Sequence, residues 1–156
     1  MQELKKFVFE AKQAGFAPGN LGIKESDGSK TIIFEKNDWK HHSNYFGGDP
    51  YSGREIVLFK GKPIWIMLYY GWVILNGHYI STRKIYNCLR EALLAIPEDG
   101  PYRGPRTFYQ TETKNLIYTN SWMGEISCFS GKEAVYLNDQ AVYIATYLGG
   151  MIDQKK

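Results

Sequence analysis

Two glutamates, Glu55 and Glu133, are the residues whose type and position most clearly permit chemistry. They occupy equivalent positions in two similar segments, 51–74 and 129–152, which align without a gap. We expect each on an apolar strand face, where a carboxylate needs a hydrogen-bonded or charged partner and where burial raises its pKa. The pair could supply tuned acid, base or ligand-anchoring groups. Alternatively, each has a structural duty, binding backbone N–H groups or an arginine, and its presence in both segments favours this alternative.

A group of aromatic side chains could line a binding pocket. Two-residue turns at 60–61 and 138–139 would place Glu55, Val57 and Ile66 on one aliphatic face of the sheet and the rings on the other. We expect the helices to cover the aliphatic face, which leaves the aromatic face for a pocket, a second core layer or a dimer interface. The aromatic candidates are Trp65, Tyr69, Tyr143 and Tyr147, with Trp39 and Tyr45 nearby in the sequence.

Arg103 is the remaining candidate for a binding site. Arg103 and Arg106 bracket a rigid Gly-Pro pair and could form a fork for a carboxylate or phosphate, or one arginine could simply bind a backbone carbonyl in a solvated loop. Neighbouring strand residues His41 and His42 point in opposite directions, so we expect no metal site. The sequence carries no dinucleotide or phosphate-loop fingerprint, so we expect no cofactor.

Composition and charge exclude several classes of protein. The chain has 156 residues, 44% of them hydrophobic and 22% charged, which fits one soluble domain. A net charge of +3 is too small to predict a nucleic-acid partner. The apolar run 64–75 is shorter than the roughly 20 residues that span a bilayer. The amphipathic start of the chain is not typical of a signal peptide, so we expect a cytoplasmic protein without membrane partners.

Helix and strand periodicities predict an α+β fold. Each half of the chain, about 1–78 and 79–156, would be a helix followed by antiparallel strands. We therefore predict a single domain with an internal repeat, in which two similar halves share an antiparallel sheet and the helices pack on one face. The predicted helices are 2–14 and 82–96, and the predicted strands outside the hairpins are 31–35, 39–46, 107–110 and 115–121.

Several short motifs give the chain a resemblance to a known family. They are Trp39, Tyr45-Phe46-Gly47-Gly48, Gly53-x-Glu55-x-Val57, Pro63-x-Trp65, Tyr69-Tyr70-Gly71, Arg103-Gly104-Pro105, Phe129-x-Gly131-x-Glu133 and Tyr147-x-Gly149-Gly150. With them the chain resembles small bacterial and archaeal domains of unknown function that occur alone or behind a helix-turn-helix segment. The resemblance implies a cytoplasmic setting and no particular reaction. The chain departs from it where His41-His42-Ser43 stand in place of a Tyr-Arg-Asp run.

These features favour a non-catalytic module that binds or senses a small molecule. Its ligand would lie against the aromatic face, with Glu55, Glu133 or Arg103 fixing polar groups. One alternative is a carboxylate-dependent enzyme with Glu55 as base, Tyr69 as acid and Arg103 as anion clamp. Another is an interaction domain that forms a homodimer, with the aromatic face as the interface between the two copies. No combination of nucleophile and base is recognisable, so we favour binding over catalysis.

Overall fold

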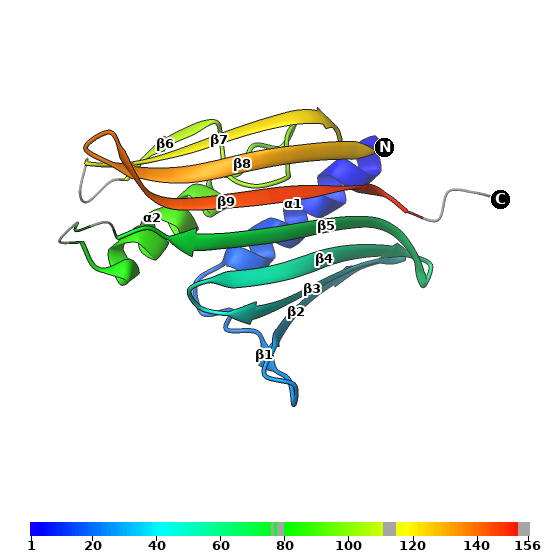
Figure 1. The fold of residues 1–156 in the computed structure, drawn as a ribbon. Coiled ribbons are helices and arrows are strands. Elements are labelled where there is room, and N and C mark those ends of the chain that lie inside the picture. The colour runs from blue at the N-terminus through cyan, green and yellow to red at the C-terminus, as the bar shows by residue number, and fades with distance from the viewer. Residues whose placement is uncertain (76, 78–79, 111–114, 153–156) are drawn as a thin grey trace.

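The computed structural model describes residues 1–75, 77, 80–110 and 115–152. Within them, one antiparallel sheet of nine strands has the order β1-β2-β3-β4-β5-β9-β8-β7-β6, and both helices lie on one side of it (Figure 1). None of the helices in these residues is long and apolar enough to cross a membrane. The elements are α1 (Gln2–Phe16), β1 (Ile23–Lys24), β2 (Lys30–Lys36), β3 (Trp39–Gly47), β4 (Tyr51–Phe59), β5 (Lys62–Val73), α2 (Thr82–Leu94), β6 (Thr107–Tyr109), β7 (Leu116–Glu125), β8 (Cys128–Leu137) and β9 (Gln140–Met151).

The predicted α+β fold of two similar halves is wrong. The molecule is mainly one large sheet with two helices, and its middle is the antiparallel pair β5 and β9, which joins the two parts of the chain. Helix α1 packs Leu4, Phe7 and Val8 into a core that includes Phe129 and Tyr147 from the other part of the chain. This core joins residues of both parts of the chain, including Val57, Trp65 and Met67 from the first, so the two halves are not separate units and the expected internal repeat does not describe the fold.

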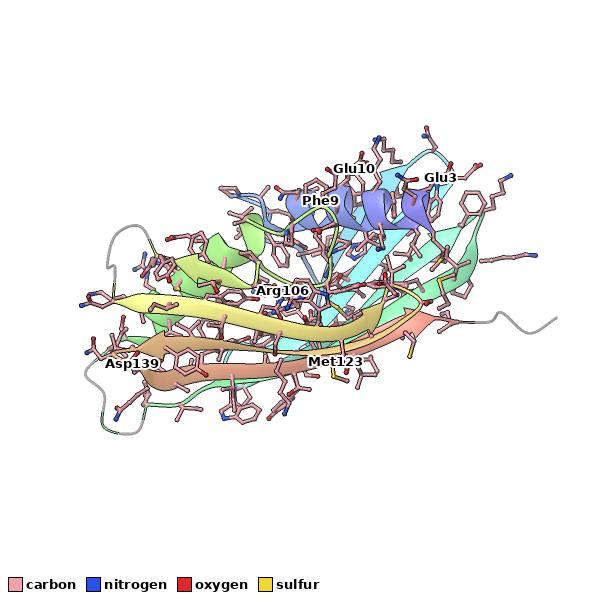
Figure 2. All side chains as sticks on the ribbon, turned by 90° about the horizontal axis from the view of Figure 1, so that it is seen from above. Glu3, Phe9, Glu10, Arg106, Met123 and Asp139 are labelled. Carbon is pink, nitrogen blue, oxygen red and sulfur yellow. The ribbon has the colours of Figure 1, made fainter. Side chains whose placement is uncertain are left out.

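The two helices form where the apolar spacing predicts them. In α1, Leu4, Phe7, Val8 and Ala11 are buried, and the helix runs past Gly15 to Phe16. Helix α2 begins after Ser81, whose hydroxyl accepts a hydrogen bond from the backbone N–H of Lys84 at 3.4 Å. Side chains fill the layer between these helices and the strands, as seen from above in Figure 2.

Both hairpins at the centre of the sheet contain a β-bulge, and this changes which residues share a face. The turn between β4 and β5 has the expected two residues, since Phe59 pairs with Lys62, but the register shifts by one residue at Ile64, so that Val57 pairs with Trp65. In β8 and β9 the register shifts in the same way at Val142. A shift of one residue moves all the following side chains of a strand to the other face.

The expectation of an aliphatic face under the helices and an aromatic face opposite is therefore wrong. Trp65 and Tyr143 lie beneath the helices and are fully buried, on the same face as the two glutamates. The face without helices instead exposes Leu68, Tyr70 and Leu148, which are 44–53% accessible. A ligand site on a separate aromatic face does not exist in this arrangement.

Candidate functional site

Glu55 lies at the centre of a buried cluster of polar groups. The Lys12 ammonium group of α1 lies 2.9 Å from its Oε1 and 2.8 Å from its Oε2. The Nε2 of His41, on the neighbouring strand β3, lies 3.0 Å from Oε2. Lys12 also donates a hydrogen bond of 2.7 Å to the carbonyl oxygen of Tyr102. The bulged hairpin thus points the carboxylate at the helix, and α1 supplies the cation that a buried carboxylate needs.

Burial and charge act in opposite directions on this cluster. Burial alone would raise the pKa of Glu55, but Lys12 and His41 more than offset it and hold the pKa at about 2. Burial lowers the pKa of Lys12, and the carboxylate of Glu55 offsets only part of this effect. Glu55 is therefore an ionised group at neutral pH and a weak base.

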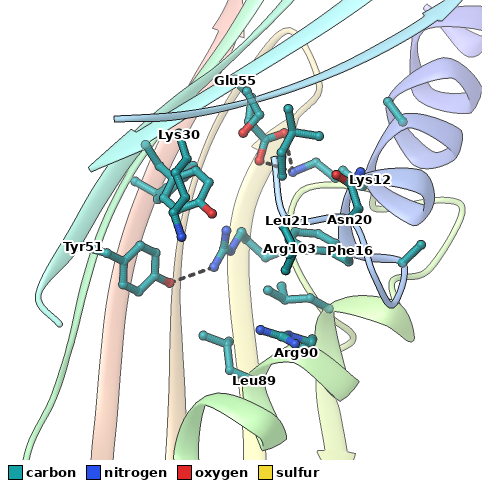
Figure 3. Close-up of a pocket in the computed structure, with 18 of the residues that line it drawn as sticks. Lys12, Phe16, Asn20, Leu21, Lys30, Tyr51, Glu55, Leu89, Arg90 and Arg103 are labelled. Carbon is teal, nitrogen blue, oxygen red and sulfur yellow. Dashed lines mark hydrogen bonds and ion pairs between the residues drawn. The ribbon is translucent and has the colours of Figure 1, made fainter. Parts of the chain in front are cut away.

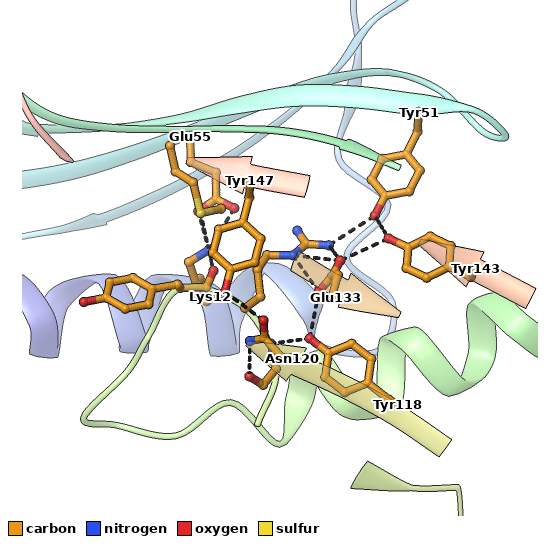
Figure 4. Close-up of polar contacts among 12 residues, drawn as sticks. Lys12, Tyr51, Glu55, Tyr118, Asn120, Glu133, Tyr143 and Tyr147 are labelled. Carbon is orange, nitrogen blue, oxygen red and sulfur yellow. Dashed lines mark hydrogen bonds and ion pairs between the residues drawn. The ribbon is translucent and has the colours of Figure 1, made fainter. Parts of the chain in front are cut away.

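Glu133 lies in a second buried cluster, which Arg103 neutralises (Figure 4). The Nη2 of Arg103 lies 2.6 Å from Oε1, and its Nε lies 3.1 Å from both carboxylate oxygens. Tyr118 and Tyr143 donate their hydroxyl groups to the same carboxylate at 2.7 and 3.0 Å. Tyr51 accepts a hydrogen bond of 3.1 Å from Arg103 Nη2 and contacts the hydroxyl of Tyr143. Every strong acceptor site of the carboxylate is thus occupied.

Burial and the charges of the second cluster together shift the pKa values of Arg103, Tyr118 and Tyr143 upward. Burial acts to lower the pKa of Arg103, but Glu133 and Tyr51 outweigh it and raise that pKa well above the usual value. Burial and the charge of Glu133 both raise the pKa of Tyr118 and of Tyr143. The guanidinium therefore stays charged and both hydroxyls stay protonated hydrogen-bond donors.

Asn120 of β7 fixes the irregular segment that carries Arg103. Its side-chain N–H donates to the carbonyl oxygen of Gly104 at 2.7 Å, and its Oδ1 accepts a hydrogen bond of 2.8 Å from Tyr147. The backbone N–H of Gly104 donates to Tyr118 at 3.0 Å. The segment is thus bound to the inner face of the sheet. Arg103 binds the carboxylate of Glu133, a residue of the protein itself, with two of its nitrogen atoms.

A cavity of about 380 Å³ lies beside both clusters, between the end of α1, the middle of α2 and the inner face of β2–β5 (Figure 3). Lys12, His41, Glu55 and Arg103 form polar parts of its wall. The Nδ1 of His41 is buried and has no hydrogen-bond partner among the described residues. Aliphatic and aromatic wall residues are Phe16, Leu21, Ile32, Tyr45, Tyr51, Tyr69, Tyr86, Leu89 and Leu93. The volume falls in the lower part of the range of small-molecule sites.

Comparison with known proteins places the chain in a family. The sequence profile of a domain of unknown function, DUF5680, matches residues 43–152, which is most of the chain. The chain belongs to the DUF5680 family. Neither the curated proteins nor the solved structures contain a chain that this sequence matches. The expected resemblance to a family of domains of unknown function is thereby confirmed at that level.

The matched region of the DUF5680 chain contains only part of the two clusters. Glu55, Arg103 and Glu133 lie inside it, whereas Lys12 and His41 precede it. His41 is the first of the three residues at which the sequence departs from the expected motif. It contacts the carboxylate of Glu55, which also contacts Lys12. The cation and the imidazole that hold Glu55 thus come from outside the matched region.

The structure brings four of the predicted site residues of the DUF5680 chain to the cavity. They are Tyr45, Glu55, Tyr69 and Arg103. The other five lie outside its wall. Trp65 is core, with its indole N–H donating to the carbonyl oxygen of Ile126 at 3.0 Å. Glu133, Tyr143 and Tyr147 belong to the buried hydrogen-bond network, and Trp39 packs against Phe7 and Phe59.

Sequence reasoning missed several residues of the site. Lys12 follows Ala11 and lies one helical turn after Val8, so its position on the apolar stripe of α1 was a usable signal. His41 alternates with His42 on β3, and the alternation alone says only that one of the two faces the core. Lys30 and Arg90, at the cavity, carry no distinguishing pattern. In the described residues, no three His, Cys, Asp or Glu side chains gather to hold a metal ion.

Proposed function

We propose that this DUF5680 protein is a non-catalytic module that binds a small molecule in the cavity beside Glu55 and Arg103, in a sensing or regulatory role. The observation that carries the proposal is the cavity itself. It combines apolar walls with a few fixed polar groups, which is the usual composition of a small-molecule site. The Nδ1 of His41 supports it, because this buried atom has no partner in the described part of the chain, and a buried polar atom without a partner costs free energy that a ligand could recover.

The properties of the carboxylate support binding over catalysis. A general base works best with a pKa near the operating pH, and the pKa of Glu55 is held at about 2. Both of its oxygens already contact Lys12, and one of them also contacts His41. Burial raises the pKa of Tyr69, which makes its hydroxyl a weak acid. These properties weigh against an enzyme with Glu55 as base and Tyr69 as acid.

A variant that fills the cavity tests the proposal. Gly15 lies in the last turn of α1 and lines the cavity, and a Cβ built there meets only Ile32, at 3.8 Å. We expect Gly15→Leu to keep the fold, because leucine favours a helix over glycine by up to about 1 kcal/mol. We expect the same variant to lose ligand binding, because the new side chain occupies the ligand's space.

The measurement is a screen of small metabolites by melting temperature, with Ala14→Leu as the matched control. Ala14 lies in the same helical turn and is not a cavity residue. A ligand at a hundred times its Kd stabilises by about 2.7 kcal/mol, or roughly 5–10 °C for a chain of this size. The wild type and Ala14→Leu should show such a shift, and Gly15→Leu should not. A shift of equal size in Gly15→Leu would place the ligand elsewhere.

A homodimer is the second candidate function, and the open face of the sheet favours it. Leu68 and Leu148 are directly paired on β5 and β9, at the centre of the sheet, and both are about half exposed. A second copy rotated by half a turn would place the same residues opposite each other, as a two-fold interface requires. This face differs from the aromatic face that the sequence suggested, since Trp65 and Tyr143 are buried beneath the helices.

We also propose a cytoplasmic location and no nucleic-acid partner. The small net charge of +3 supports the second statement. Cys88 and Cys128 are both free thiols, as is usual in a reducing compartment, and this supports the first.

A further inference from the structure

We infer that the ligand of the cavity is a small organic anion with an apolar or aromatic body, whose carboxylate or phosphate group lies between Lys30 and Arg90. The inference rests on the proposed function, since it names the ligand class of the same cavity. Its starting point is the charge of the wall. Four of the lining residues are lysine or arginine, and Glu55 is the only carboxylate that lines the cavity within the described residues.

The two buried cations are already neutralised. Lys12 lies 2.8 Å from the carboxylate of Glu55, and Arg103 lies 2.6 Å from that of Glu133. A buried ion pair of this kind leaves little net charge for a ligand. The pairs therefore shape the wall and do not attract an anion on their own.

Lys30 and Arg90 differ, because neither forms an ion pair with a carboxylate in the part of the chain that the structure describes. Lys30 begins β2 and Arg90 lies on α2, so the two charges come from separate elements at the exposed rim of the cavity. Figure 3 shows the Lys30 side chain pointing toward Arg103, with Arg90 on the α2 side of the same cavity. Two cations at a rim with low-dielectric walls, without a carboxylate partner in the described ranges, attract an anion and weaken the binding of a cation.

The rest of the cavity wall favours a ligand whose main part is apolar. Phe16, Ile32, Leu89 and Leu93 line the cavity beside these cations. A fully solvated inorganic ion would leave this apolar surface wet, whereas an organic anion covers it. The ligand should therefore combine one anionic group with a compact hydrocarbon or aromatic part that fits about 380 Å³.

His41 adds a preference inside the cavity. In the tautomer whose Nε2–H donates to Glu55 and whose Nδ1 carries no proton, Nδ1 is an acceptor. A ligand with a hydroxyl or N–H group on its apolar part would satisfy this atom, which has no partner among the described residues. Indole and phenol acids combine these features with a carboxylate.

The test compares acids with their uncharged counterparts on the full chain. The probes are indole-3-acetate and 4-hydroxyphenylacetate against the corresponding amides, and phenyl phosphate against phenol, with Kd measured by calorimetry. We expect the acids to bind more tightly than the neutral probes and added salt to weaken only the acids. We expect Lys30→Met with Arg90→Met to raise the Kd of the acids by about tenfold or more, as the loss of charged hydrogen bonds would.

The matched control is Arg83→Met with Lys84→Met. Both residues are exposed on α2 and neither lines the cavity, so this variant removes the same charge from the molecule without changing the cavity. Its Kd for the acids should equal that of the wild type. Equal binding of acids and neutral probes, unchanged in the Lys30 and Arg90 variant, would overturn the anion inference and leave cavity binding standing. Failure of every probe to bind the wild type would count against both.

Discussion

Replacing Glu133 by glutamine is expected to lower the free energy of unfolding by about 3–5 kcal/mol, which is the usual cost of removing one partner of a buried ion pair. The side chain of Glu133 is fully buried and that of Arg103 is 4% exposed, so water cannot replace the lost charge. A glutamine would keep an acceptor for Tyr118 or Tyr143 but would leave the guanidinium uncompensated. Urea denaturation at neutral pH, followed by tryptophan fluorescence, measures the change.

Glu35→Gln is the matched control for this prediction. Glu35 contacts Lys40 at 2.8 Å, a similar distance, but the two side chains are 59% and 41% exposed. An exposed pair of this kind contributes about 1 kcal/mol or less.

The removal of both charges of the buried pair, by Arg103→Met with Glu133→Leu, should lower the free energy of unfolding by less than the sum of the two single changes. Equal losses for Glu133→Gln and Glu35→Gln would show that the buried cluster does not stabilise the fold as described.

Replacing Lys12 by methionine is expected to destabilise the chain by about 3 kcal/mol at neutral pH, and the loss should shrink in acid. In the folded chain the pKa of Glu55 is about 2, against an ordinary value of 4.5. A depressed pKa contributes stability above pH 4.5, and this stability is lost as the pH falls from 4.5 through 2. This lowering of the Glu55 pKa corresponds to about 3 kcal/mol of free energy of unfolding, at about 1.36 kcal/mol for each pKa unit.

The pH dependence distinguishes this effect from a simple loss of packing. Without Lys12, burial dominates and raises the pKa of Glu55, so the acid-sensitive part of the stability should disappear from Lys12→Met. Urea denaturation at pH 7 and at pH 2.5 should therefore give a smaller gap between wild type and variant at the lower pH. Lys36→Met serves as control, because Lys36 pairs with Glu10 at the surface. A gap that is the same at both pH values would contradict the charge-based explanation.

The sequence was a good guide to the elements and a poor guide to their faces. The apolar stripe of α1 and both two-residue turns were readable, because they depend on local spacing and turn chemistry. The bulges were not readable with the same rules. Pro63 next to the first bulge was a signal, since proline cannot donate to the ladder, but the second bulge at Val142 has no such residue.

The site was only partly predictable because it depends on contacts between distant segments. Glu55 and Glu133 were identified by their equivalent positions. The alternative that each binds backbone N–H groups or an arginine matches the contact of Glu133 with Arg103, whereas Glu55 contacts Lys12 and His41. Lys12 comes from α1, whose apolar stripe indicates the face that it buries, whereas Arg103 comes from the irregular segment before β6, for which no periodicity predicts a position. Steric fit between paired strands is a second feature that the sequence does not reveal. A Cβ on Gly131 would lie 2.2 Å from the ring of Tyr147, a constraint that appears only in three dimensions.

The most direct test of the account is a methyl NMR titration of the leucines with indole-3-acetate. Leu89 and Leu93 line the cavity, whereas Leu68 and Leu148 lie on the opposite, open face of the sheet. We expect saturable shifts at Leu89 and Leu93 and unchanged resonances at Leu68 and Leu148. Shifts confined to Leu68 and Leu148, or changes there that follow protein concentration and not ligand, would contradict a cavity site and favour the sheet face as an interface.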